Sequence, residues 1–81
     1  MAQYFFHLRD GAETLLDDEG CELADIAAVA RQALREARSL ISQEALAGAI
    51  NLAQRLEVED GLGVMVYRLD FEDAIAVRHP A

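Results

Sequence analysis

Apolar and polar residues alternate with a period of two near the start of the chain, which predicts a β-strand over residues 4–9. One face of this strand would carry Tyr4, Phe6 and Leu8, and the other Phe5, His7 and Arg9. Asp10-Gly11 follows, a dipeptide typical of tight turns, and a short return strand is expected after it. The first predicted element is therefore a strand hairpin over about residues 3–16.

The period changes to 3.6 residues in the middle of the chain, which predicts one amphipathic helix over about residues 26–46. Residues 21–23 are expected to extend the chain briefly before it. Asp25 is expected to cap the helix, because its carboxylate can accept hydrogen bonds from the free N–H groups of the first turn. Gly48 is expected to end the helix in the left-handed conformation.

A second pair of period-two segments predicts a strand hairpin over about residues 54–71, with a loop at residues 60–63. Its last strand would place Met65, Tyr67 and Leu69 on one face and Val64, Val66 and Arg68 on the other. Residues 72–81 are expected to form a short C-terminal tail.

The order of elements is thus β-β-α-β-β, within a single domain over residues 1–81. Strands grouped around one amphipathic helix predict an α+β fold. We expect a mostly antiparallel four-stranded sheet with the long helix packed on one face, the face of Tyr4, Phe6 and Leu8.

Composition and charge narrow the classes of function. Hydrophobic residues make up 53% of the chain, as in a globular domain, and the formal net charge is -8. Such an acidic chain is not expected to bind nucleic acid or an anionic membrane, since both attract basic surfaces. The N-terminus lacks the basic start and apolar run of a signal peptide, so a cytoplasmic location is expected.

The single cysteine, Cys21, cannot form a disulfide within the chain. It lies among acidic residues, and neighbouring negative charge should raise the pKa of its thiol. We therefore expect no redox or nucleophilic role for Cys21.

Several short motifs together carry a family resemblance. The strand and turn at residues 4–11 read YFFHLRDG, and the acidic turn at residues 17–20 reads DDEG. Glu22-Leu23 and Asp25 precede the Ala-rich helix, and residues 71–75 read FEDAI. This pattern resembles a family of short bacterial domains of unknown function. The resemblance covers nearly the whole chain and implies a stand-alone cytoplasmic domain, but it supplies no activity.

Two groups of residues are candidates for chemical sites. The acidic turn Asp17–Glu19 offers carboxylates to a cation, but its spacing does not match a calcium loop, and a solvated turn also explains it. His7 and Arg9 share a strand face and could form an acid–base pair, but no nucleophile lies near them in sequence. We therefore predict no catalytic, cofactor-binding or metal-binding residues and no cofactor.

The second face of the sheet is the predicted contact surface, because only one helix is available to cover a two-faced sheet. An open apolar face in a small protein often marks an interface. The candidate partner contacts are three apolar residues and three polar residues around them: Phe5, Val64 and Val66; His7, Arg9 and Arg68.

The favoured hypothesis is a non-enzymatic protein-interaction or self-association module, as a homodimer or with another protein. One alternative is an antitoxin-like or regulatory partner whose acidic surface masks a basic protein. Another is a small metal-dependent enzyme that uses the acidic turn with His7.

Overall fold

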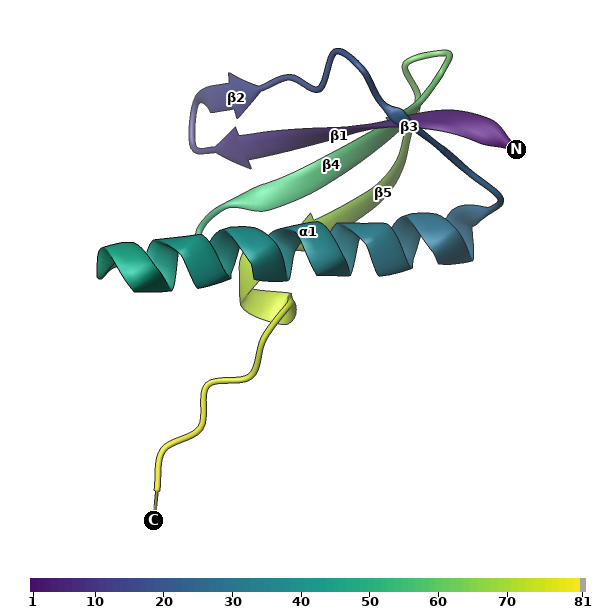
Figure 1. The fold of residues 1–81 in the computed structure, drawn as a ribbon. Coiled ribbons are helices and arrows are strands. Elements are labelled where there is room, and N and C mark those ends of the chain that lie inside the picture. Colours follow the sequence, from purple (N-terminus) through teal and green to yellow (C-terminus); the bar gives the residue numbers. More distant parts are fainter. Residues whose placement is uncertain (81) are drawn as a thin grey trace.

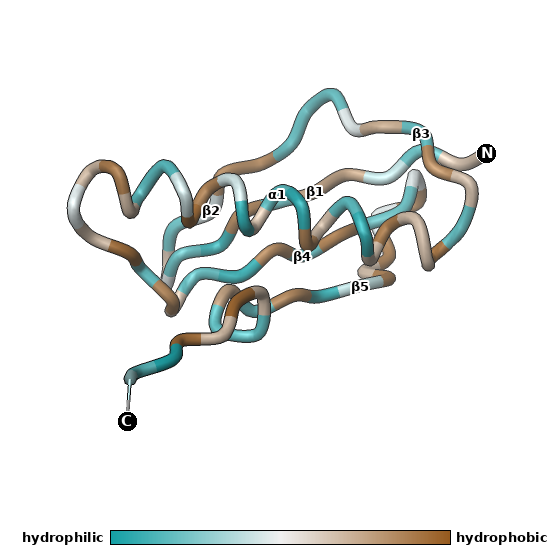
Figure 2. The backbone as a smooth tube through the Cα atoms, turned by 60° about the horizontal axis from the view of Figure 1, so that its bottom comes forward, coloured by the Kyte–Doolittle hydropathy of each residue, from teal (hydrophilic) through white to brown (hydrophobic). Residues whose placement is uncertain are grey.

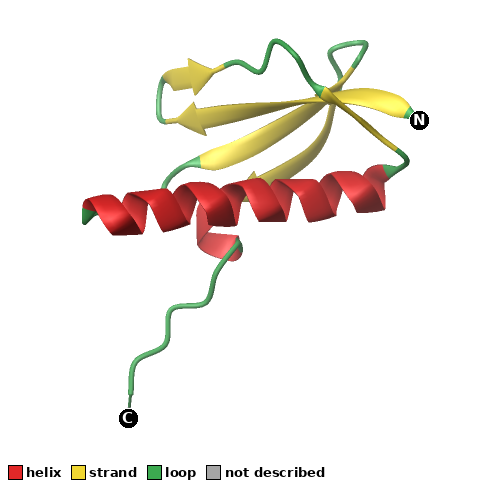
Figure 3. Cartoon of the chain, in the orientation of Figure 1, coloured by secondary structure: helices red, strands yellow, loops and turns green. Residues whose placement is uncertain are grey.

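The computed structural model describes residues 1–80 and shows a twisted antiparallel sheet with one long helix packed on one face (Figures 1 and 3). The elements in chain order are β1 (Ala2–Asp10), β2 (Glu13–Leu15), β3 (Cys21–Leu23), α1 (Ile26–Ala47), β4 (Arg55–Asp60), β5 (Met65–Asp70) and the 3₁₀ helix η1 (Phe71–Asp73). The strands lie in the order β2-β1-β4-β5. The predicted α+β fold is confirmed.

β3 is a fifth strand in a segment that was expected only to extend the chain. It pairs with the first half of β1, with Tyr4 opposite Cys21. β2 pairs with the second half of the same edge of β1, with Leu8 opposite Leu15. One long strand is therefore bordered by two short ones, and residues 16–20 lie in the gap between them.

Both predicted ends of α1 are confirmed. The carboxylate of Asp25 accepts from the N–H of Ala28 at 2.8 Å. Gly48 has a φ of 98°, and its N–H donates to the carbonyl of Ala45. Among the described residues, no helix combines the length and the apolar character needed to cross a membrane.

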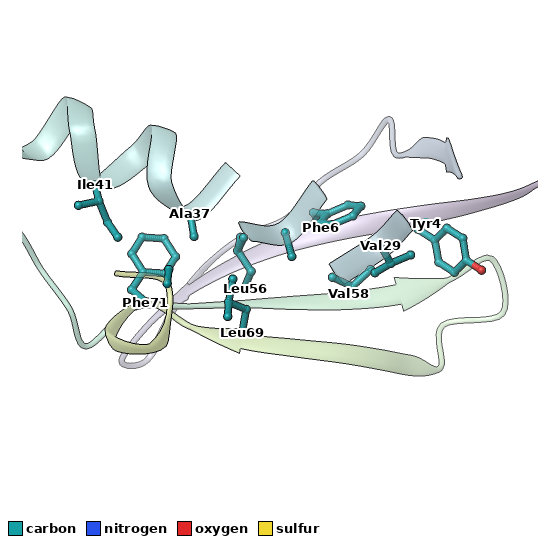
Figure 4. Close-up of a cluster of buried hydrophobic side chains, with 11 residues drawn as sticks. Tyr4, Phe6, Val29, Ala37, Ile41, Leu56, Val58, Leu69 and Phe71 are labelled. Atoms are coloured by element: carbon teal, nitrogen blue, oxygen red, sulfur yellow. The ribbon is translucent and has the colours of Figure 1, made fainter. Parts of the chain in front are cut away.

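The core lies between α1 and the face of the sheet that carries Tyr4 and Phe6, as predicted (Figure 4). Val29, Ala33 and Ala37 of the helix have no exposed surface. The alanines allow a close approach to the sheet, so Leu56 and Val58 of β4 are also buried.

The predicted faces of the last strand are only partly correct. Tyr67 and Leu69 lie opposite Val58 and Leu56 on the core face. A bulge then shifts the register, so that Met65 lies opposite Glu59 on the other face and is 54% exposed. The prediction that Met65 shares a face with Tyr67 and Leu69 is therefore wrong, because the bulge inserts an extra residue into the alternation.

The packed part of the chain continues beyond β5 into the segment expected to be a tail. Phe71 and Ala74 are buried in the core, and Nε of Arg38 donates to the carbonyl of Ala74 at 2.8 Å. From residue 76 onward the described chain is exposed and extends away from the body (Figure 1). The last residue of the predicted tail, Ala81, lies outside the described residues.

Candidate functional site

The face of the sheet away from α1 is charged. Glu57 of β4 accepts from Arg9 of β1 and from Arg55 of its own strand, with 2.8 Å between Arg55 Nε and Glu57 Oε2. On β5, Nε of Arg68 donates to Oδ1 of Asp70 at 3.0 Å. Arg9 and Arg68, two of the predicted contact residues, are thus held in ion pairs within the chain.

These ion pairs favour the charged forms of their members. Hydrogen bonds from Arg55 and Arg9 lower the pKa of Glu57 below its usual value, although burial acts in the opposite direction. The carboxylate of Asp70 raises the pKa of Arg68. The Arg68–Asp70 pair is exposed, and pairs of this kind contribute little to stability, whereas the Glu57 carboxylate is only 13% exposed between its two arginines.

The other predicted contact residues lie in different environments. Phe5 is half-buried, and a Cβ added to Gly20 would come within 3.0 Å of its ring. His7 is only 6% exposed, and Val66 packs against the core. Val64 is exposed. These residues thus differ in burial, and their role as partner contacts stays a prediction.

Asp17 fills the gap between β2 and β3. Its Oδ2 accepts from the N–H of Phe6 at 3.0 Å, and its Oδ1 accepts from the N–H groups of Glu19 and Gly20 at 3.1 and 3.0 Å. Burial raises the pKa of Asp17, but these main-chain donors outweigh burial and hold that pKa below its usual value. The carboxylate thus takes the place of main-chain acceptors that a continuous strand would supply.

His7 is engaged at both ring nitrogens. Nδ1 accepts from the N–H of Asp17 at 3.0 Å, and Nε2 lies 3.3 Å from a carboxylate oxygen of Glu59. These partners assign the neutral tautomer with its proton on Nε2. Because the nitrogens of His7 and both oxygens of Asp17 already have partners, the geometry favours structural roles over acid–base or metal chemistry.

A second group of carboxylates lies where β5 meets η1. Asp70, Glu72 and Asp73 each have an oxygen within 4.8 Å of the others. Glu72 and Asp73 are exposed, and Asp70 is paired with Arg68. Exposed acidic groups commonly gather without a cation, so we assign no metal site here.

A groove of about 480 Å³ opens on the helix side of the sheet, between α1 and the segment that joins β2 to β3. It forms because α1 packs against β3, β4, β5 and η1, and leaves the sheet near β2 uncovered. Leu15 and Leu16 line the groove and are 70% and 62% exposed. Leu8 and Leu40 also line it, at the margin of the core. In Figure 2 the segment leaving β2 is hydrophobic and then becomes hydrophilic at the acidic turn.

The polar lining of the groove is acidic. Asp17 and Glu19 contribute from the loop, and Glu36 contributes from α1. Cys21 also lines the groove, where burial and then the charges of Glu36 and Asp17 raise the pKa of its thiol. The direction of this shift confirms the expectation from the sequence. A surface that joins exposed leucines to carboxylates suits a partner that is apolar and basic.

Sequence reasoning did not single out Leu15, Leu16 or the structural role of Asp17. Two adjacent leucines in the predicted return strand were an available signal, because on a period of two they cannot both face the core. The pattern Asp17-x-x-Gly20 was another, because an aspartate often accepts from main-chain N–H groups two and three residues later.

Comparison with curated proteins and with solved structures finds no match to this chain. Comparison with family models finds a match over residues 3–72, which include α1, the His7–Asp17 contact and all five strands except the first residue of β1. The chain therefore belongs to the family described as a domain of unknown function, DUF6894.

Proposed function

We propose that this protein is a non-enzymatic interaction module whose groove binds an apolar and basic segment of another protein. The observation that carries the proposal is the exposure of Leu15 and Leu16 beside an acidic lining. Exposed leucines that lie together in a hollow offer apolar surface for burial by a partner.

Charge supports a basic partner over an acidic or neutral one. The formal net charge of the chain is -8, and the groove carries Asp17, Glu19 and Glu36. Complementary charge speeds encounter and disfavours acidic partners. The regulatory, antitoxin-like alternative is compatible with this proposal, because a domain that masks a basic protein would also bind a basic segment of it.

The test is an NMR titration of the isotope-labelled protein with two synthetic peptides. One peptide alternates leucine with lysine, and the other alternates leucine with glutamate. We expect the basic peptide to shift the amide signals of groove residues in a saturable manner, and the acidic peptide to leave them unchanged. Shifts spread evenly over the surface, or equal shifts with both peptides, would contradict the proposal.

Matched variants locate the binding. Leu16→Lys places a positive charge in the groove, of the same sign as the charge of the basic peptide. It should therefore abolish the shifts that this peptide causes. Leu62→Lys is the control, because Leu62 is 89% exposed in the loop between β4 and β5 and does not line the groove. Equal loss of binding in both variants would show that the groove is not the site.

A further inference from the structure

β5 is one edge of the sheet: among the described strands it pairs with β4 alone. The main-chain N–H and C=O groups on the outer side of an edge strand can pair with a strand of another molecule. β5 also carries one cation and one anion, Arg68 and Asp70, on the same face. The side chains of Arg68 and Asp70 are 52% and 34% exposed, so a neighbour could reach both.

The pairing of β5 with β4 determines which main-chain groups face outward. The N–H of Phe71 donates to the carbonyl of Gln54 at 2.9 Å, and these two residues continue the register of the two strands. In an antiparallel pair, hydrogen-bonded and non-hydrogen-bonded positions alternate. Leu69, two residues earlier, therefore bonds to β4, and the main-chain groups of Arg68 and Asp70 face the free edge.

The regular part of this edge is short. The bulge between β4 and β5 lies near Val66, which packs against the core, and η1 begins at Phe71. Asp70 is still extended, with φ -77° and ψ 138°. Arg68 and Asp70 are therefore the two residues of the regular segment that can exchange main-chain hydrogen bonds with another strand.

Two copies of β5 related by a two-fold axis can pair antiparallel in three registers that use these residues. Centring the pair on Arg68 places two guanidinium groups opposite each other, and centring it on Asp70 does the same with two carboxylates. Like charges directly opposite each other are destabilising. Centring the pair on Leu69 places Arg68 of each copy opposite Asp70 of the other, so both cross-strand pairs are attractive.

We infer that this protein self-associates through β5, in an antiparallel pair centred on Leu69 that joins two sheets into one. The charge pattern of the edge is complementary to itself in this register, which identifies the partner as a second copy of the chain. The inference goes beyond the proposed function, because β5 and the groove beside β2 lie at opposite edges of the sheet.

The test uses two charge-reversal variants, Arg68→Asp and Asp70→Arg, in analytical ultracentrifugation at concentrations up to about 1 mM. Within one variant every cross-strand pair at these positions joins like charges. In a mixture, Asp at position 68 faces Arg at position 70, and Arg at position 68 faces Asp at position 70. We expect a dimer for the unchanged protein, monomers for each variant alone, and a dimer for the equimolar mixture.

The mixture separates association from the ion pair within the chain, because each single variant loses that internal pair whether or not it is mixed. Thermal unfolding of each variant checks that it is folded before association is measured. A monomeric unchanged protein would overturn the inference, as would variants that dimerise alone. A dimer of the unchanged protein together with a monomeric mixture would overturn the register.

Discussion

The main-chain N–H of Asp17 donates to Nδ1 of His7 at 3.0 Å, and the Asp17 carboxylate accepts from the N–H of Phe6. Two consecutive residues of β1 are therefore tied to a single residue of the loop between β2 and β3. These contacts hold the loop against the edge where strand pairing is interrupted. Asp17 and Glu19 of this loop line the groove, so the same contacts also hold one wall of the groove in place.

Replacing His7 with leucine should leave the N–H of Asp17 without its acceptor. An unpaired buried donor costs about 1–3 kcal/mol, and we expect a loss of that order in the free energy of unfolding. Amide hydrogen exchange by NMR should be faster at Asp17 in His7→Leu. The control is Glu59→Gln, which changes only the partner of Nε2 and should leave exchange at Asp17 slow. Unchanged exchange in His7→Leu would contradict this role.

Asp17→Asn should lower the free energy of unfolding more than Asp18→Asn does. Asparagine has one neutral acceptor oxygen in place of two charged ones, so it cannot accept all three main-chain hydrogen bonds as the Asp17 carboxylate does. We therefore expect the free energy of unfolding to fall by about 2 kcal/mol. Asp18 is exposed, and Asp18→Asn should change stability by less than about 0.5 kcal/mol. Denaturant unfolding of both variants measures the difference. Equal effects would show that the carboxylate of Asp17 is not the anchor of the loop.

The lowered pKa of Asp17 predicts how stability depends on pH. A carboxylate with a folded-state pKa below its unfolded value stabilises the fold fully above the unfolded pKa, and loses that contribution as pH falls through the folded pKa. The stability difference between the unchanged protein and Asp17→Asn should therefore be constant near neutral pH and shrink below about pH 4. Urea unfolding at a series of pH values measures it. A difference that persists undiminished to about pH 2 would contradict the assignment.

Features fixed by local sequence were predictable. Asp25 and Gly48 mark the ends of α1 through contacts within one helical turn, and the alternation in β1 places Tyr4 and Phe6 in the core. These features depend on side chains and main-chain conformations of neighbouring residues, which a single sequence displays directly.

Features that depend on long-range packing were not predictable. The bulge beside Val66 reverses the environment of Met65, and periodicity alone contains no sign of the inserted residue. The groove depends on where α1 rests across the sheet, and that position follows from packing with η1 and Ala74 at the opposite edge. A helix known only to be amphipathic could cover either half of the sheet.

Gly20 and Gly63 offer a matched pair of substitutions. Both have positive φ, 70° and 78°, so alanine is strained at each position. At Gly20 an added Cβ would also lie 2.8 Å from the carbonyl oxygen of Tyr4, whereas nothing lies within 4 Å at Gly63. We expect Gly63→Ala to cost about 1 kcal/mol and Gly20→Ala about 2 kcal/mol more, measured by thermal unfolding. Similar costs would mean that the loop can move away from β1.

The reactivity of Cys21 reports on the charge of the groove. Burial and the carboxylates of Glu36 and Asp17 raise the pKa of the thiol, and only the thiolate reacts with iodoacetamide. Alkylation near pH 8 should therefore be slower in the folded protein than in a short unstructured peptide containing cysteine. Glu36→Gln removes one of these charges and should speed alkylation of the folded protein about twofold.

Glu72→Gln is the control, because Glu72 is not among the groups that shift the pKa of the Cys21 thiol, and it should leave the alkylation rate unchanged. Equal rates in all three proteins would show that Glu36 exerts no effective field in the groove, and would weaken the argument for a basic partner.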